Sequence, residues 1–283
     1  VMRLAAKSAL NRDKSQLGFK PYELKQFDYI LKNPHGIILV TGPTGSGKST
    51  TLYTALSELN KEDVNIITVE DPVEANIDGI NQVQVNTKAD LTFASALRSI
   101  LRQDPDIICV GEIRDGETAE IAMRAAMTGH LVITTIHTED AISAIDRLRD
   151  MGVPPYLIAS GLRGVISQRL LRRICTSCKT EYVPPKKALE LAKMPDIPGK
   201  IYWHGVGCDR CFHSGYRGRI GVFEVMTIQE GLRRCIMEGA DRQKFMEVAR
   251  KESGYITMAE HAQEMVDKGI TTVDEVIRTL SSL

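Results

Sequence analysis

The sequence predicts an α/β fold in which a mainly parallel sheet is covered by helices on both faces. Short apolar runs typical of buried strands alternate along the chain with longer segments that have helical periodicity. The first run, 37–40, leads into the pattern Gly42-x-x-x-x-Gly47-Lys48-Ser49, and a helix-compatible segment follows as far as about Asn60. Strand, glycine-rich loop and helix in this order are the setting of a phosphate-binding loop, so the motif agrees with the fold class.

Composition and charge are those of a soluble globular protein. Of the 283 residues, 43% are hydrophobic and 25% are charged, and 36 basic residues balance 36 acidic ones. This balance gives no indication of a protein that coats nucleic acid, and no nucleic-acid partner is expected. No apolar run approaches the roughly 18 residues that span a bilayer, and the amino end lacks the layout of a signal peptide. We therefore expect a cytoplasmic protein that is at most peripheral to a membrane.

The segment 42–50 is the candidate nucleotide-binding loop. Its glycines let the chain curl so that backbone N–H groups point at phosphate oxygens, and the start of the next helix adds a positive dipole end. Lys48 can reach the β- and γ-phosphates of ATP, and the Ser49 hydroxyl can bind Mg²⁺. The candidate binding residues are Gly42, Pro43, Thr44, Gly45, Ser46, Gly47, Lys48, Ser49 and Thr50.

Residues before the loop indicate a short lead-in. Residues 1–14 have a helical pattern, and a second helix is expected from Tyr22 to Leu31. Because the chain begins with Val1 and not with methionine, we expect it to be part of a longer protein.

Acidic residues follow two of the predicted strands. The strand 64–69 ends in the cluster 70–74, which holds three acids including Glu70, and the strand 107–112 ends in Glu112. Because ligand-handling residues gather at the carboxyl ends of strands, we expect both near the nucleotide, with a solvated turn as the alternative for the first cluster. Glu112 is the candidate for orienting or deprotonating the attacking water. Gly111 stands where a magnesium-binding aspartate is usual, so Mg²⁺ is expected to be held through water or by the first cluster.

Two arginines are candidates for contacts with phosphate. Arg98 and Arg102 are four residues apart on a predicted helix, 93–103, so they share one face. That face is either solvated or meets phosphates across a subunit boundary, for which arginine is the usual choice. Arg114 closely follows Glu112.

Two histidines flank the predicted strand 131–136. His137 lies just past its carboxyl end, where it can sense a γ-phosphate by hydrogen bonding. His130 lies before the strand, and its role stays open between structure and function.

Further helices are expected in the second half of the core. They cover 117–127, 140–151 and 156–171, and the last of them ends in the basic cluster Arg169-Leu170-Leu171-Arg172-Arg173.

Two C-x-x-C pairs follow that cluster. Cys175, Cys178, Cys208 and Cys211 can supply four thiolates to a tetrahedral Zn²⁺, a closed and therefore structural site. The alternatives are redox dithiols or coincidence. The long spacer between the pairs is expected to carry a helix at about 186–193.

The remainder of the chain is expected to be a turn and strand at 215–225, followed by helices. These helices run from about Gln229 to Leu283, with breaks at Gly239, Gly254 and Gly269. Cys109 and Cys235 are expected to be buried single thiols.

With these residues together, the chain resembles the type II/type IV secretion ATPase superfamily, the hexameric motors of type II secretion and type IV pilus assembly. Residues 42–49 match the Walker A box of that family, 70–74 resemble its aspartate box, 107–112 its atypical Walker B box ending in Gly-Glu, and 128–137 its histidine box. The four cysteines are similar to the tetracysteine motif of the secretion and pilus-extension branch. Retraction motors are expected to lack that motif.

The resemblance implies a domain order. Residues 1–35 would be the tail of a preceding domain and a linker, 36–171 a RecA-like P-loop NTPase core, 172–215 a small zinc-binding module and 216–283 a C-terminal helical subdomain.

The resemblance also implies roles for residues. The candidate catalytic residues are Glu112, Lys48, Glu70, His137, Arg98, Arg102 and Arg114. Arg98, Arg102 and Arg114 would serve the nucleotide site or the ring interface, and Arg3 would act from the edge of the preceding domain. His261 stands where an acidic residue is expected, a departure that should concern only local surface.

The function implied is a homo-hexameric motor that uses ATP, Mg²⁺ and a structural Zn²⁺. It would work with inner-membrane platform proteins, at the cytoplasmic face of the inner membrane, in pseudopilus or type IV pilus assembly. One alternative is a zinc-containing P-loop ATPase acting on nucleic acid, which the cysteine pairs and the cluster 169–173 motivate and the 5% aromatic content disfavours. A non-hydrolysing nucleotide switch is the third possibility, which Glu112 weakens.

Overall fold

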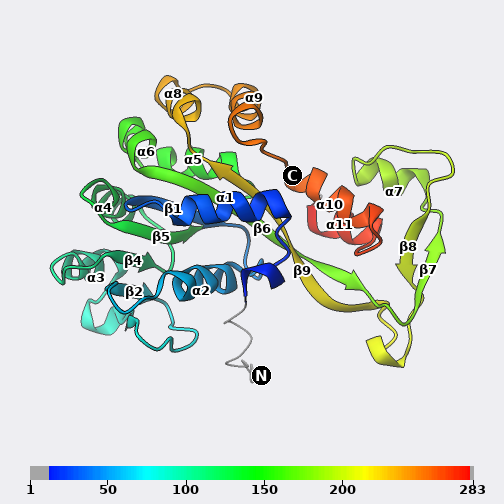
Figure 1. The fold of residues 1–283 in the computed structure, drawn as a ribbon, viewed down its shortest axis with the longest axis horizontal. Helices are drawn as coiled ribbons and strands as arrows, with labels where there is room; N and C mark the ends of the chain where they lie inside the picture. The colour runs from blue at the N-terminus through cyan, green and yellow to red at the C-terminus, as the bar shows by residue number, and fades with distance from the viewer. Residues whose placement is uncertain (1–12, 281–283) are drawn as a thin grey trace.

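The centre of the protein is a seven-stranded sheet, seen in a computed structural model that describes residues 13–280 (Figure 1). Across the sheet the strands are β3 (Asn81–Gln84), β2 (Ile66–Glu70), β4 (Ile107–Val110), β5 (Leu131–Ile136), β1 (Gly36–Thr41), β6 (Leu162–Ile174) and β9 (Tyr216–Thr227). All neighbouring strands are parallel except β6 and β9, which are antiparallel. The predicted α/β fold with a mainly parallel sheet is confirmed. The helix expected at 1–14 and the candidate Arg3 lie outside the described residues, apart from 13 and 14.

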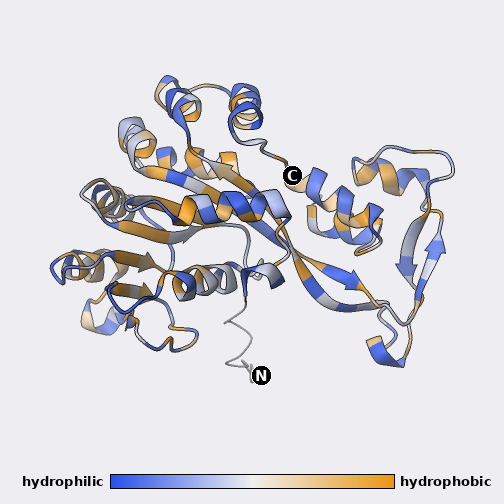
Figure 2. Ribbon diagram, viewed as in Figure 1, coloured by the Kyte–Doolittle hydropathy of each residue, from blue (hydrophilic) through white to orange (hydrophobic). Residues whose placement is uncertain are grey.

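Helices cover both faces of this sheet, as its buried strands require. Alternate residues of β1 enter different cores: Ile37 and Leu39 join one cluster, and Ile38 and Val40 join the other. One face is covered by α1 (Pro21–Leu31) and α2 (Lys48–Leu59). The other is covered by α3 (Phe93–Ile100), α4 (Gly116–Met127), α5 (Ala141–Asp150) and α6 (Pro155–Gly161). Figure 2 shows the apolar residues concentrated on the strands and on the inner sides of these helices.

One predicted helix, 156–171, is wrong. Only its first part is helical, as α6, and from Leu162 the chain forms β6, which pairs with β1 and β9. Pairing with two strands distant in sequence outweighs the local helical pattern. Gly164 contributes, because glycine is a poor helix former and a Cβ there would lie 2.4 Å from Ile30 Cδ1 of α1.

The carboxyl-terminal part is built on the long ladder of β6 and β9. The ladder runs from Gly164 opposite Thr227 to Ile174 opposite Tyr216, and so leads away from the sheet centre. Beyond its far end lie β7 (Lys179–Tyr182), β8 (Tyr202–Gly205) and α7 (Lys186–Leu191), the helix expected within the spacer. Strand β6 crosses the predicted boundary at 172, and β9 begins at the predicted boundary at 216. The division into domains stays a prediction.

Four helices follow β9, as expected. They are α8 (Glu230–Glu238), α9 (Arg242–Ser253), α10 (Met258–Asp267) and α11 (Val273–Leu280). Gly239 and Gly254 end α8 and α9 with φ angles of 67° and 62°, which glycine adopts most readily. The first two helices pack on the main core, whereas α10 and α11 form a separate core with α7 and the far half of the ladder. No helix among residues 13–280 is both long and apolar enough to cross a membrane.

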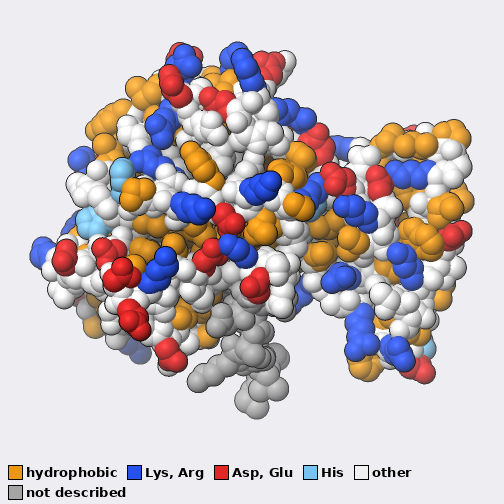
Figure 3. All heavy atoms as spheres, viewed as in Figure 1, with side chains coloured by type: hydrophobic (Ala, Val, Ile, Leu, Met, Phe, Trp, Pro, Cys, Tyr) orange, Lys and Arg blue, Asp and Glu red, His pale blue; other side chains and the backbone are white. Residues whose placement is uncertain are grey.

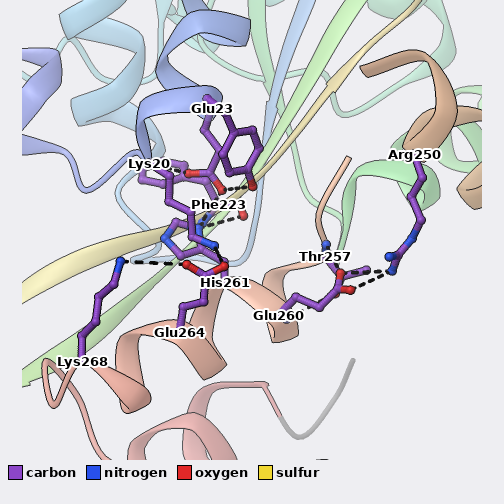
Figure 4. Close-up of polar contacts among 10 residues, drawn as sticks. Lys20, Glu23, Phe223, Arg250, Thr257, Glu260, His261, Glu264 and Lys268 are labelled. Carbon is purple, nitrogen blue, oxygen red and sulfur yellow. Dashed lines mark hydrogen bonds and ion pairs between the residues drawn. The ribbon is translucent and has the colours of Figure 1, made fainter. Parts of the chain in front are cut away.

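A buried ion pair joins α1 to α10 (Figure 4). His261 Nδ1 lies 2.8 Å from Glu23 Oε1, and each side chain is 1% exposed. Around this pair, Lys20 Nζ contacts Glu264 Oε1 at 2.6 Å. The expectation that His261 concerns only local surface is therefore wrong, because its buried side chain contacts Glu23 of α1 and Phe223 of β9.

Candidate functional site

The candidate nucleotide site begins where β1 runs into the loop 42–47. Gly42 and Gly47 have φ angles of 143° and 93°, in the range that side chains rarely adopt. A Cβ at Gly42 would lie 2.3 Å from the carbonyl oxygen of Gln168 on β6, so glycine is needed for the loop to pack there. The backbone is therefore curled as a phosphate-binding loop requires.

Lys48 is held inside this loop. Its ammonium donates to the carbonyl oxygens of Gly42 at 2.8 Å and Pro43 at 3.1 Å. Burial lowers the pKa of Lys48, and the charge of Arg169 lowers it further, whereas the charge of Glu112 raises it. The charges of Lys48 and Glu112 thus influence each other, although the two residues are 64 positions apart in the sequence.

Three of the predicted residues meet where β4 and β5 end. The Glu112 carboxylate forms an ion pair with the Arg114 guanidinium, and its Oε2 lies 3.3 Å from His137 Nε2. Glu112 is 17% exposed and His137 is 48% exposed, so the group is open to solvent on one side. The hydrogen bond from Arg114 to Glu112 raises the pKa of Arg114. The Glu112 carboxylate is thus held at the strand ends by two side chains, Arg114 and His137, that are both partly exposed to solvent.

Hydrogen bonds between strand ends position this group. Thr135 Oγ1 of β5 donates to the Gly111 carbonyl oxygen at 2.7 Å, and the Ile113 N–H donates to the Thr135 carbonyl oxygen at 2.9 Å. The Thr138 N–H, just after His137, donates to Thr41 Oγ1 of β1 at 3.0 Å. The backbone on both sides of Glu112 and His137 is therefore tied to the sheet.

The glycine before Glu112 has a steric reason. A Cβ at Gly111 would lie 3.3 Å from both the Glu70 Cα and the Val69 carbonyl oxygen of β2. The end of β2 thus leaves less room at this position than a side chain usually has.

Glu70 is placed differently from Glu112. It is 4% exposed, and its carboxylate accepts hydrogen bonds from Tyr53 Oη, from Thr68 Oγ1 at 2.6 Å and from Gln82 Nε2 at 3.1 Å. These contacts do not bring Glu70 to the Glu112 group. Its neighbour Asp71 does approach that group, with Oδ2 3.9 Å from Arg114 Nη1.

The remaining candidates from the sequence lie outside the group. Arg98 on α3 forms an ion pair with Glu117 of α4, and Arg102 is exposed beyond the end of α3, which stops at Ile100 and not at the predicted 103. His130 Nδ1 lies 3.0 Å from the Ala125 carbonyl oxygen, before the start of β5.

Sequence reasoning missed two residues of β6 that face the site. Gln168 Nε2 donates to the Ser46 carbonyl oxygen of the loop at 2.9 Å. Arg169, 5% exposed, donates from Nη2 to the Glu139 carbonyl oxygen at 3.4 Å and is near enough to influence Lys48. Assigning 162–171 as a strand would have pointed to them, because a strand next to β1 must pass the loop.

The structure also changes the meaning of the basic cluster 169–173. Arg169 is buried, and Arg172 Nη2 contacts Glu275 Oε2 at 2.7 Å. On the face shown in Figure 3, basic and acidic side chains are interspersed. The cluster is therefore not a continuous exposed patch of positive charge.

The four paired cysteines converge at the far end of the β6–β9 ladder. Their Sγ atoms all lie within 4.8 Å of one another, with separations of 3.9 Å for Cys175 and Cys208 and 3.9 Å for Cys178 and Cys211. A tetrahedral Zn²⁺ with Zn–S bonds of about 2.3 Å places sulfurs about 3.8 Å apart, whereas a disulfide needs about 2.05 Å. The residues fit a four-thiolate zinc site. Cys109 and Cys235 are buried elsewhere, as expected.

Known proteins similar to this chain include secretion and pilus-assembly proteins. The sequence model of the family described as "Type II/IV secretion system protein" matches residues 1–278. The type II secretion system ATPase E of Vibrio cholerae is 48% identical over 278 residues, which are 98% of this chain and 55% of that protein. The type IV pilus assembly ATPase PilB of Thermus thermophilus is 47% identical over 279 residues, which are 98% of this chain and 31% of that protein. The chain thus spans about half the length of most curated relatives that it matches.

A solved structure shows the same fold. The structure described as "Crystal Structure of the Pilus Retraction Motor PilT and Bound ADP" is similar with a TM-score of 0.70 and 31% sequence identity, covering 95% of this chain and 67% of that one.

Proposed function

The chain belongs to the type II/IV secretion system protein family, and from that premise we propose that it is the ATP-hydrolysing part of a motor for pseudopilus or type IV pilus assembly. One observation carries the proposal: the Glu112 carboxylate, which contacts Arg114 and His137, is tied to the phosphate-binding loop that holds Lys48. The Thr138 N–H, just after His137, donates to Thr41 Oγ1 just before the loop, and the charge of Glu112 influences Lys48. A carboxylate beside the bound phosphates is the type of group that can orient or deprotonate the attacking water.

Each residue of the site has a part in this reaction. The loop N–H groups and Lys48 bind the phosphates of ATP. The Ser49 hydroxyl would hold Mg²⁺, which would neutralise phosphate charge. Glu112 accepts a proton from water as the water oxygen bonds to the γ-phosphorus, and the bond from that phosphorus to the β–γ bridging oxygen breaks to release ADP. His137 and Arg114 orient Glu112, and His137 is placed to respond to the γ-phosphate.

The other catalytic candidates have roles outside the chemical step in this proposal. Arg98 and Arg102, exposed on and after α3, are available to a neighbouring subunit. Glu70 supports the end of β2 from within the core. Asp71, which approaches Arg114 beside Glu112, would be the acid of this cluster for water-mediated contact with Mg²⁺.

The cysteine cluster holds a structural Zn²⁺ in this proposal. Cys175, Cys178, Cys208 and Cys211 would provide four thiolates, and the ion supplies a cross-link between the two knuckles and no reactive position. Metal analysis should find about one zinc per chain, and Cys211→Ser should release it. A cysteine cluster that stays metal-free in a folded protein would contradict this part.

The assembly and its setting are also proposals. The motor would be a homo-hexamer when the whole protein is present, at the cytoplasmic face of the inner membrane, where its strokes act on platform proteins of the secretion or pilus machine. The names of the relatives support the role in secretion or pilus assembly, since they are an ATPase of type II secretion and an ATPase of type IV pilus assembly.

Steady-state hydrolysis of ATP with Mg²⁺ tests the proposed function. We expect turnover by the wild-type chain, and loss of both ADP binding and turnover in Lys48→Ala. Adding DNA separates the alternative: stimulation of hydrolysis that declines steeply with salt would favour an enzyme acting on nucleic acid. A wild-type chain that binds ATP without hydrolysing it, alone or at high concentration, would favour a nucleotide switch.

A further inference from the structure

Gln168 is a buried side chain that joins β6 to the nucleotide loop. It is 2% exposed, and its Nε2 donates to the Ser46 carbonyl oxygen at 2.9 Å. A Cβ at Gly47 would lie 3.2 Å from the same nitrogen. The amide of Gln168 therefore lies directly against the Ser46–Gly47 peptide, on the side of the loop that faces β6.

The planarity of the peptide gives this contact a consequence. In a trans peptide the C=O and the next N–H point in opposite directions. Because Gln168 holds the Ser46 C=O toward β6, the Gly47 N–H must point away from β6, into the curl of the loop where phosphate would lie. Without the Gln168 donor, this peptide plane is free to rotate and the N–H loses its fixed direction.

We propose that Gln168 is a positioning residue for nucleotide binding, which orients the Gly47 N–H toward phosphate through its hydrogen bond to Ser46. This inference rests on the proposed function of the site. A preformed cradle binds more tightly because less ordering is needed when the ligand arrives.

The chemistry of the side chain explains why an amide suits this place. The Ser46 carbonyl needs a donor, and Gln168 reaches it from a strand that the sheet holds rigidly between β1 and β9. A carboxylate of the same shape offers only acceptors at neutral pH and would repel the carbonyl oxygen. A methionine of similar length offers no donor and leaves the buried carbonyl unpaired.

Binding of fluorescently labelled ADP with Mg²⁺ tests the inference. One net hydrogen bond corresponds to roughly a three- to tenfold change in affinity, so we expect the dissociation constant to rise by about that factor in Gln168→Met and by more in Gln168→Glu. Gln243→Met, an exposed glutamine on α9, is the matched control and should bind like the wild type.

Thermal unfolding separates positioning from general support. If Gln168 positions the loop for nucleotide, ADP should raise the melting temperature of Gln168→Met by less than it raises that of the wild type. Structural support alone lowers the melting temperature of the nucleotide-free protein and leaves the ADP-dependent increase unchanged, and that result would overturn the proposal.

A measurement on the wild type does not depend on the folding of any variant. The amide resonance of Gly47 should shift strongly when ADP is added, and a resonance that does not move would overturn the proposal. Wild-type protein that fails to bind ADP would overturn the proposed function together with this inference, whereas equal binding by wild type and Gln168→Met would overturn the inference alone.

Discussion

The ends of β2 and β4 carry the same type of residue in very different surroundings. Each strand is followed in the sequence by acids, and each end lies at the same edge of the sheet. Glu70 is enclosed and accepts hydrogen bonds from three side chains, whereas Glu112 is partly open and shares its carboxylate between an arginine and a histidine. We infer that Glu70, whose carboxylate is enclosed and hydrogen-bonded to three side chains, supports the structure. Glu112, whose carboxylate is partly exposed, is the one that water and nucleotide can reach.

The largest effect should come from Glu112→Gln. We expect hydrolysis to fall by about 10²- to 10⁴-fold, because a general base is lost, while ADP binding is retained. The measurements are steady-state phosphate release and nucleotide affinity. Glu120→Gln, which changes an exposed acid on α4, is the control. Hydrolysis near the wild-type rate in Glu112→Gln would show that Glu112 is not the general base and that its role does not differ from that of Glu70.

Glu23 extends the comparison to a buried glutamate whose partner is a histidine. Removing one member of a buried ion pair costs about 3 kcal/mol, so Glu23→Gln should lower the free energy of unfolding by that amount. Urea denaturation measures it. Glu264→Gln changes a half-exposed acid beside Lys20 and should cost less than about 1 kcal/mol. Equal losses of unfolding free energy in the two variants would show that burial of Glu23 and His261 does not increase their contribution to stability.

Glu70→Gln tests the enclosed carboxylate. The amide cannot accept from all three donors, so we expect a loss of about 2 kcal/mol in the free energy of unfolding and a change in hydrolysis of less than about threefold. The two quantities should be measured on the same preparation below its unfolding range. A stable variant with hydrolysis reduced as far as in Glu112→Gln would place Glu70 in the chemistry.

Among the four test variants, the smallest change in free energy is expected from Arg114→Ala. It frees Glu112 from its ion pair but leaves His137 in contact, so hydrolysis should fall by about tenfold, close to 1.4 kcal/mol. Steady-state phosphate release measures this fall. A rate equal to that of the wild type would show that Arg114 does not orient the carboxylate.

Much of the fold follows from local pattern. The apolar runs of β1, β2, β4 and β5 are short and bounded by turns, and the breaks at Gly239 and Gly254 end helices as expected. The segment 162–174 could not be assigned in this way, because its strand exists only through pairing with β1 and β9. The same error concealed Gln168 and made Arg169 look like part of a surface cluster.

The sequence by itself determined the two motifs whose binding residues lie close together along the chain. The loop 42–50 and the C-x-x-C pairs depend on residue type and short spacing, which a turn can convert directly into geometry. Only the tertiary structure decided which strand-end acid is exposed, what encloses His261 and which side chain supports the loop. These outcomes depend on the order of strands in the sheet and on the helices packed against it, and neither is written in any one stretch of sequence.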